Sequence, residues 1–401
     1  MNRQPEVAVA SAGLAPRLVV DGRAVTADGI GPDQKLLGLT LLERTALAAR
    51  RSGYGSVFVL AEEADSHRFR AILARLADVE VGSTPPEGGG ARTVCVPGTI
   101  VGERNWLEAA ARMDVPGDGC VVLGGEVVIS GHLVPWPRAA AMGAVAAADN
   151  TAPALSPLRI AGRPDLAVAE HRLLRSLGKS TDGFMERHVE RPVSRILSRR
   201  LAKTAVTPNQ MTLISAVVGL SAAPFFLSAA PLWQTVGALI FLAHSILDGC
   251  DGELARLKFQ ESRWGGILDF WGDNVVHAAI FGCMAAGWSA SIGATWPLAL
   301  GAAAVAGALG SASFVYWRVM RPKRGEGPLY VSVAKERRSR LVSMLDSLSR
   351  RDFIYLVLLL SLFGKAAWFL TLAAIGAPIF FVMLLVVAAQ EARTASGAPA
   401  S

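Results

Sequence analysis

The pattern of apolar and polar positions changes near the middle of the chain. Before about residue 175, short apolar runs such as VAVAS, SVFVL, TVCVPG and CVVLGGEVVIS alternate with amphipathic stretches such as LLERTALAARR and SHRFRAILARLA. Strand-like runs that alternate with helical ones are typical of an α/β domain built on a mostly parallel sheet. We therefore predict a cytoplasmic α/β domain over residues 1–175.

Beyond Pro208 the apolar positions form long continuous runs. Six such segments lie at roughly 210–228, 232–254, 264–287, 294–317, 352–366 and 368–390. A helix needs about 20 apolar residues to cross the hydrocarbon of a bilayer, and each segment is near that length, although the fifth is short. The pattern predicts an all-α polytopic membrane domain of six transmembrane helices at 207–392, with a disordered tail at 393–401.

A basic amphipathic segment lies between these two parts, within a predicted linker at 176–206. It reads FMERHVERPVSRILSRRLAK, and its arginine-rich face and scattered apolar residues suit a juxtamembrane helix on the membrane surface. A solvated linker helix is the alternative interpretation.

Charge and composition then give the environment and orientation of the chain. The 401 residues are 52% hydrophobic and carry a net charge of +7, and the basic residues concentrate beside the apolar segments. Anionic lipid is therefore a better expected partner than nucleic acid. The stretch 318–351 holds ten Lys and Arg residues, whereas the links after segments one and three hold none and the link after segment five holds only Lys365. This bias predicts a multi-pass protein of the cell (inner) membrane with both termini in the cytoplasm.

The start of the chain and the positions of the cysteines argue against other classes of protein. The start, MNRQPEVAVASAG, lacks a basic stretch followed by a long apolar core, so we expect no cleaved signal peptide. The four cysteines are far apart and show no C-x-x-C spacing, which argues against a disulfide framework or a thiolate metal site.

Four aspartates lie around the junction of the second and third apolar segments. They are Asp248, Asp251, Asp269 and Asp273, and spacings of three and four residues put each pair on one helical face. One Asp at the centre of a membrane helix costs roughly 2.5 to 3.5 kcal/mol, so we expect cations among these acids. Oxygen ligands without cysteine favour Mg²⁺ or Mn²⁺, and Mg²⁺ commonly completes its shell with substrate phosphates.

The residues between the aspartates fit a phosphate-bearing substrate. Gly252, Ala255 and Gly265 are small enough to let a nucleotide or a neighbouring helix approach the backbone. Arg256 can pair with a diphosphate. Asp273 is our candidate for the carboxylate that takes a proton from an attacking hydroxyl.

Together these residues form the pattern D-x-x-D-G-x-x-A-R-x8-G-x3-D-x3-D, which resembles the signature of the CDP-alcohol phosphotransferases. Every fixed position is filled, by Asp248, Asp251, Gly252, Ala255, Arg256, Gly265, Asp269 and Asp273. The resemblance implies a site for two Mg²⁺ or Mn²⁺ ions, in which the first three aspartates are ligands and the fourth is a general base that also touches the second ion. An acceptor hydroxyl then attacks the phosphorus bound to the donor alcohol, and CMP leaves. The resemblance also implies a homodimer.

Other candidate residues lie outside this pattern. The family places a T-P-N run before its first spanning helix, which here is Thr207, Pro208 and Asn209. Thr207 is suited to be the N-cap of that helix and Pro208 its first residue. The resemblance also makes Asn209 a candidate contact of the nucleotide. Arg318, Arg321 and Arg351 are candidates for binding a phosphorylated acceptor, although juxtamembrane arginines often only fix topology and meet anionic lipid.

Two histidines lie one helical turn from an aspartate. His244 precedes Asp248 by four residues and His277 follows Asp273 by four, so each can hydrogen-bond its neighbour along the helix. We assign neither as a metal ligand.

The beginning of the chain resembles the sugar-phosphate nucleotidyltransferases. The stretch AGLAPRL at 12–18, followed by Lys35, is similar to their A-G-x-G-x-R-L loop, which cradles nucleotide phosphates with backbone amides. Two departures stand out: Ala15 and Pro16 replace a glycine and an amide donor, and Gly125 and Glu126 stand where a metal-binding Gly-Asp is expected. The resemblance therefore implies the fold and leaves open whether this domain transfers nucleotides.

The combination of these two domains resembles bifunctional enzymes that make CDP-inositol from inositol phosphate and CTP and couple it to a second inositol phosphate. With an inactive first domain, the alternative is a phospholipid synthase that uses CDP-diacylglycerol or another CDP-alcohol made elsewhere. An ion or proton transporter is a more distant alternative, but it predicts acids near the middle of the membrane and an internal repeat of spans, and the sequence has neither. A scaffold with a dead site predicts losses in the motif, and none occurs.

Overall fold

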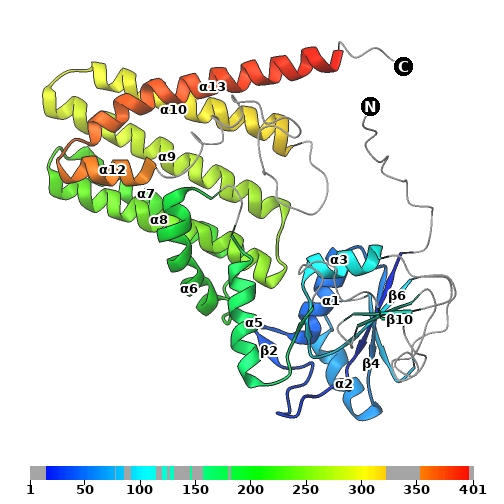
Figure 1. Ribbon diagram of the computed structural model, residues 1–401. Coiled ribbons are helices and arrows are strands. Elements are labelled where there is room, and N and C mark those ends of the chain that lie inside the picture. Colours follow the sequence, from blue (N-terminus) through cyan, green and yellow to red (C-terminus); the bar gives the residue numbers. More distant parts are fainter. Residues whose placement is uncertain are drawn as a thin grey trace. The chain divides into compact units, whose positions relative to one another are not determined.

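The computed structural model describes residues 15–76, 78–84, 92–113, 120–123, 127–130, 145–146, 157–178, 182–321 and 353–396. The chain divides into two compact units, Met1–Arg175 and Ser176–Ser401. Figure 1 shows that strands and helices alternate in the first unit and that the second consists of helices.

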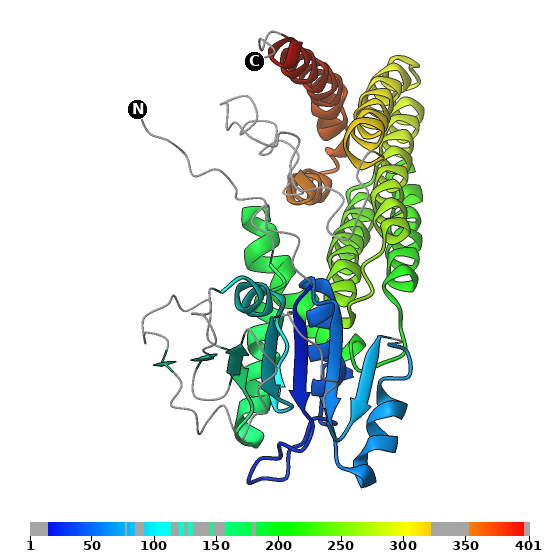
Figure 2. The same ribbon diagram turned by 90° about the vertical axis from the view of Figure 1, so that its right-hand side faces the viewer.

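A seven-stranded sheet in the order β10-β8-β9-β6-β1-β4-β5 forms the centre of the first unit, and Figure 2 shows its strands next to one another. Its strands are β1 (Arg17–Asp21), β4 (Ser56–Leu60), β5 (Val79–Gly82), β6 (Thr93–Pro97), β8 (Cys120–Leu123), β9 (Val127–Ser130) and β10 (Val145–Ala146). Strand β1 pairs in parallel with β4 and β6, β4 with β5, and β10 with β8. Strand β9 is antiparallel to β6 and β8. The predicted mostly parallel sheet is therefore confirmed.

The remaining elements of this unit are helices and two small ladders. The helices are α1 (Leu41–Arg51), α2 (Glu63–Ile72), α3 (Arg104–Arg112) and α5 (Arg163–Arg175); β2 (Lys35–Leu36) pairs with β3 (Leu39–Thr40), and β7 (Ile100–Val101) with β11 (Leu158–Arg159). Helix α1 begins where the sequence predicts, because the Thr40 side chain accepts from the Glu43 amide and Glu43 reaches back to the Thr40 amide. Leu18 and Val20 of β1 are fully buried in the core.

Two strands of this unit begin or end at positions other than those the sequence predicts. The run CVVLGGEVVIS, treated in the sequence as a single strand-like run, folds as the antiparallel pair β8 and β9. Residues 124–126 between these strands lie outside the described residues, and with them Gly125 and Glu126, the second departure from the nucleotidyltransferase pattern. Arg17 and Leu18, expected in a phosphate loop, instead begin the central strand β1, while residues 12–14 and the VAVAS run also lie outside. The VAVAS run and the run that forms β1 are both apolar, so hydrophobicity alone does not predict which of them is the central strand.

The connection that leaves the carboxyl end of β1 is therefore residues 22–34. Ligands of open parallel sheets lie where neighbouring strands lead to opposite sides, which here is between β1 and β6. In this structure the Gly98 amide donates to the Asp21 carbonyl at 2.9 Å, and a Cβ at Gly98 would lie 2.9 Å from the Pro32 ring. The connection thus packs, through Pro32, against Gly98 directly after β6.

The second unit consists of helices joined by short turns. They are η2 (Glu186–Glu190), α6 (Arg191–Leu201), α7 (Pro208–Ala222) with η3 (Ala223–Leu227), α8 (Pro231–Lys258), α9 (Arg263–Ile292), α10 (Trp296–Val315) with η4 (Tyr316–Met320), α12 (Phe353–Leu362) and α13 (Ala366–Ser396). Each of the six apolar segments overlaps one of the helices from α7 onward. Helix α13 continues to Ser396, so the helical part reaches into the stretch 393–401, which we expected to be a disordered tail.

Among the residues that the structure describes, four helical segments are long and apolar enough to cross a membrane: Pro208–Leu227, Arg263–Ile292, Trp296–Met320 and Ala366–Gln390. Helix α12 is apolar but has only 10 residues, and α8 carries charged residues over its last three turns. The chain is thus a multi-pass membrane protein, and six spans remain an expectation.

Local features bring α7, α8 and α9 together near the acidic residues. Helix α8 ends at Lys258 and is followed by Phe259 in a left-handed conformation, with φ 54°. Helix α9 begins at Arg263, directly after Ser262, whose side chain accepts from the Gly265 amide. A Cβ at Gly219 of α7 would lie 2.7 Å from Val276 of α9 and 2.8 Å from His244 of α8. Glycine at this position lets the three helices approach closely.

Candidate metal and transfer site

Three carboxylates meet where α8 ends and α9 begins. One oxygen each from Asp248, Asp251 and Asp269 lies within 4.8 Å of the others, and we call these residues the acidic cluster. Asp248 and Asp251 are only 5% and 6% exposed. Carboxylates this close and this buried repel one another unless a cation lies among them.

The hydrogen bonds around the acidic cluster leave room for a cation. The Thr212 hydroxyl of α7 donates to Oδ2 of Asp251, which orients that carboxylate. Oδ1 of Asp269 is buried and has no hydrogen-bond partner among the residues that the structure describes. Oxygens on opposite sides of a Mg²⁺ ion are about 4 Å apart, so a set of oxygens with this spacing fits Mg²⁺ or Mn²⁺.

Asp273 lies one turn beyond Asp269 on α9 and contacts a histidine. Its Oδ1 lies 3.5 Å from Nε2 of His244, while Nδ1 of His244 is 2.8 Å from the Ser215 carbonyl and donates to it. Helical spacing had paired His244 with Asp248, so this contact between α8 and α9 is one that the sequence does not reveal. Asp273 is 16% exposed, which leaves it accessible to a substrate hydroxyl.

The structure also brings together Asn209 and Gly265, two of the predicted nucleotide contacts. A Cβ at Gly265 would lie 2.8 Å from Oδ1 of Asn209 and 2.9 Å from Oγ of Ser262. The predicted cap of α7 is confirmed: Thr207 accepts from the Gln210 amide, and Pro208 is the first helical residue.

Comparisons with known proteins agree with this geometry. Residues 205–388 match the family model described as CDP-alcohol phosphatidyltransferase, and this range contains the whole acidic motif. Residues 205–388 therefore form a domain of this family, called the CDP-alcohol phosphotransferase domain below.

Relatives of the chain include inositol phosphate enzymes. It is 36% identical over 122 residues to the "Bifunctional IPC transferase and DIPP synthase" of Thermococcus kodakarensis, covering 30% of this chain and 27% of that protein. It is 35% identical over 145 residues to the protein of that name from Rubrobacter xylanophilus, covering 36% and 32%. An "Archaetidylinositol phosphate synthase" of Pyrococcus horikoshii is 29% identical over 176 residues, or 43% of this chain and 86% of that protein.

The matches to the bifunctional relatives thus cover less than a third of their length. The solved structure of Mycobacterium tuberculosis phosphatidylinositol phosphate synthase with CDP-DAG bound aligns with 48% of this chain and 92% of that chain, at 18% identity. Its TM-score of 0.34 is too low to establish a common arrangement of the helices.

Within the CDP-alcohol phosphotransferase domain, Arg256 lies among backbone groups at the end of α8. Its Nη2 donates to the Leu177 carbonyl at 3.0 Å, and its buried Nε has no hydrogen-bond partner in the described part of the chain. A Cβ at Gly252 would lie 3.4 Å from Nη1 of Arg256, and half-buried Ala255 precedes the arginine. Arg256 therefore keeps a donor available for a ligand.

The predicted acceptor arginines of the domain follow α10. Arg318 lies in η4, and the Arg321 guanidinium stands 4.2 Å from the centre of the Trp317 ring. The Arg321 carbonyl accepts from Nη2 of Arg263 at 3.0 Å, which ties the end of η4 to the start of α9. Arg351 lies outside the described residues.

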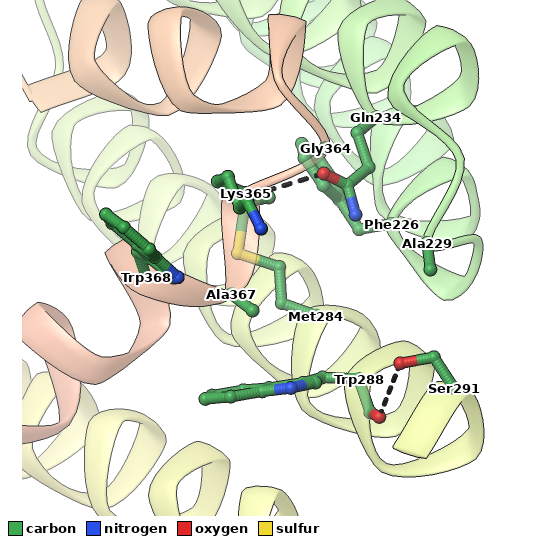
Figure 3. A pocket seen from close by; sticks show the side chains of 11 residues that line it. Phe226, Ala229, Gln234, Met284, Trp288, Ser291, Gly364, Lys365, Ala367 and Trp368 are labelled. Atoms are coloured by element: carbon green, nitrogen blue, oxygen red, sulfur yellow. Dashed lines mark hydrogen bonds between the residues drawn. The ribbon is translucent and has the colours of Figure 1, made fainter.

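A pocket near the start of α8 is separate from the acidic cluster (Figure 3). Gln234, Lys365, Trp368 and Trp288 line it, and Gln234 accepts from the Ala366 amide at 3.2 Å. Gln234 precedes Asp248 by 14 residues, or about 21 Å along a helix. This pocket therefore cannot share a small ligand with the acidic cluster.

Proposed function

We propose that this chain is a membrane enzyme that moves a phosphoalcohol from a CDP-linked donor to an alcohol acceptor and releases CMP. The observation that carries the proposal is the acidic cluster, whose three oxygens lie within 4.8 Å of one another beside the unpartnered Oδ1 of Asp269. Such a site is suited to binding a metal-chelated diphosphate, the group that a CDP-alcohol contains.

The proposed reaction is an in-line displacement at phosphorus. The acceptor hydroxyl oxygen bonds to the phosphorus that carries the donor alcohol, the bond from that phosphorus to the bridging oxygen of the diphosphate breaks, and CMP leaves. Asp273 takes the hydroxyl proton. Asp248, Asp251 and Asp269 would hold two Mg²⁺ or Mn²⁺ ions, and Asp273 would also contact the second ion. Bound metal would stabilise the charge on the attacking and leaving oxygens.

We further infer six transmembrane helices in the cell (inner) membrane, with both termini in the cytoplasm and a homodimeric assembly. An exposed apolar stripe on η2 and α6 supports a surface position for this amphipathic segment. The stripe consists of Phe184, Val189, Val193 and Ile196, which are 40% to 66% exposed. Such a stripe would enter the interface of an anionic bilayer.

Two donors remain in consideration. The name of one relative, an archaetidylinositol phosphate synthase, favours inositol phosphate as the acceptor. In this alternative the nucleotidyltransferase-like first domain supplies CDP-inositol as the donor. The alternative, a phospholipid synthase that takes CDP-diacylglycerol, is favoured by Pro32, which packs against Gly98 at the end of the central strands. That packing argues for an inactive first domain.

Release of CMP by the purified protein separates these alternatives. With Mg²⁺ or Mn²⁺ and inositol phosphate, product from CTP alone means that the first domain makes its own donor. Product only with a supplied CDP-alcohol means that it does not, and the CDP-alcohol that works identifies the pathway. Absence of CMP with every donor and acceptor contradicts the proposed function.

Removal of residues 1–175 is expected to leave transfer unchanged within about twofold when the CDP-alcohol is supplied. The reason is that all residues of the acidic motif lie in the second compact unit. The measurement is the rate of CMP release by full-length and shortened protein, compared at equal amounts of membrane-inserted protein. Complete loss in shortened protein that still folds and binds Mn²⁺ would show that the first unit is required for transfer.

The substitution Gly265→Ala is expected to weaken donor binding about tenfold or more. Its Cβ would lie 2.8 Å from the Asn209 amide oxygen, so the asparagine must move away from α9. The check is the KM for the CDP-alcohol, with Gly282→Ala on the same helix as control, since a Cβ there meets nothing within 4 Å. Equal KM values for the two variants would remove Asn209 and Gly265 from the donor site.

A further inference from the structure

A buried polar network joins the segment before the first membrane helix to α8. The Arg191 guanidinium donates to both oxygens of Asp182 and to Oε1 of Glu186 at 2.9 Å, and to Oε1 of Glu253 on α8 at 3.0 Å. Ser194 donates to the same Glu253 oxygen at 2.8 Å. The side chains of Arg191 and Glu253 are 3% and 0% exposed.

A second link runs between the same two elements. The Ser245 hydroxyl on α8 donates to Oε2 of Glu190 at 2.8 Å, and both residues are buried. We call the two links together the polar network; it consists of Asp182, Glu186, Glu190, Arg191, Ser194, Ser245 and Glu253. None of these residues occupies a fixed position of the family motif; Glu253 lies at a variable position between Gly252 and Ala255.

The polar network holds a permanently charged arginine. Burial lowers the pKa of Arg191, but the hydrogen bond and charge of Asp182, together with Glu186 and Glu253, outweigh this effect and raise the pKa above its ordinary value. The guanidinium therefore remains a cation, and its planar fork sets the direction of each bond it donates.

The polar network and the acidic cluster use different faces of α8. At about 100° per residue, Glu253 lies about 80° to one side of Ser245, whereas Asp248 and Asp251 lie about 60° and 120° to the other. A rotation of α8 that breaks the bonds to Ser245 and Glu253 therefore carries both aspartates away from Asp269.

We propose that Arg191 and Glu253 are positioning residues that set the rotation of α8 and so hold Asp248 and Asp251 against Asp269. The inference rests on the proposed metal site. Stability alone does not explain the polar network, because an apolar pair of similar size in place of a buried ion pair is often equally or more stable. Directional bonds to two elements, by contrast, select one arrangement of the helices.

The test is Mn²⁺ binding to the full-length protein in detergent, followed by electron paramagnetic resonance. Glu253→Gln is expected to raise the Mn²⁺ concentration for half-saturation about tenfold, as the loss of groups that orient metal ligands typically does. Arg191→Lys keeps the charge but lacks the fork, so we expect a smaller rise of about threefold. Arg200→Met, at an exposed position of the same helix, is the control and should bind as the wild type does.

The triple variant Arg191→Met, Asp182→Asn and Glu253→Met separates positioning from stability. It removes the buried guanidinium together with the two buried carboxylates that it contacts, so thermal stability should return close to the wild-type value, while the Mn²⁺ concentration for half-saturation stays about tenfold higher. The rate of CMP release at saturating Mn²⁺ should then lie within about twofold of the wild type. Ser245→Ala removes one hydrogen bond without removing a charge, so it is the test variant if the charged variants do not fold. It should raise the Mn²⁺ concentration for half-saturation about twofold to threefold.

Two results overturn the inference in distinguishable ways. Wild-type affinity for Mn²⁺ in the folded triple variant, or in Ser245→Ala where only that variant folds, would make the polar network purely structural. No Mn²⁺ binding by the wild type would refute the metal site itself, and the positioning role with it.

Discussion

Asp273→Asn is expected to reduce CMP release by at least about a hundredfold while the protein still inserts and binds the CDP-alcohol. An amide cannot accept the proton of the acceptor hydroxyl, and general bases typically contribute about a hundredfold to ten-thousandfold. The rate of CMP release at saturating Mn²⁺ checks the loss, and equilibrium binding of the donor checks that the site is intact. Donor binding should survive because Asp248, Asp251 and Asp269 form the acidic cluster without Asp273, and the amide oxygen of an asparagine can still contact the second ion.

A matched control for this loss is Glu261→Gln. It also removes one carboxylate charge, from the connection between α8 and α9, but lies outside the acidic cluster. CMP release by this variant should stay within about twofold of the wild type. If Asp273→Asn transferred at a rate similar to Glu261→Gln, another group would have to be the base.

Asp269→Asn is expected to weaken Mn²⁺ binding by more than about a hundredfold and to abolish transfer at ordinary metal concentrations. Its carboxylate is the only one that α9 contributes to the acidic cluster among the described residues. Loss of groups that merely orient metal ligands already costs about tenfold to a hundredfold in affinity. Titration with Mn²⁺ checks the affinity, and addition of EDTA to the wild type should abolish transfer in the same way.

The metal-free stability of this variant distinguishes ligand loss from misfolding. Without metal, the three carboxylates repel one another, so an amide at position 269 relieves repulsion and should not lower the melting temperature. A lower melting temperature together with unchanged Mn²⁺ affinity would contradict the assignment of Asp269 as a metal ligand.

Periodicity predicted the helical elements well because their signal is local. The apolar segments from 210 onward overlap the helices, and the predicted cap at Thr207 depends only on neighbouring residues. The sheet was harder: two apolar runs near the start of the chain compete for the central strand, and Arg17 begins it only because the second run pairs with β4 and β6. Strand pairing is a long-range property that a single sequence does not display.

The same division applies to the site. Spacing put Asp248 and Asp251 on one helical face and predicted a metal site with Asp269, because those constraints lie within 26 residues of chain. The Thr212 hydroxyl on Asp251, the His244 ring beside Asp273 and the bond from Arg191 to Glu253 join residues 29 to 62 positions apart. Such contacts depend on how helices pack, so only the structure reveals them.

The most direct test of the proposed chemistry is the stoichiometry of CMP and product with a supplied CDP-alcohol, an alcohol acceptor and Mn²⁺. We predict one CMP for each phosphoalcohol transferred, with no CMP when either the metal or the acceptor is omitted. CMP formed without transfer would indicate hydrolysis, and Mn²⁺ binding without CMP from any donor would contradict phosphotransfer by this site.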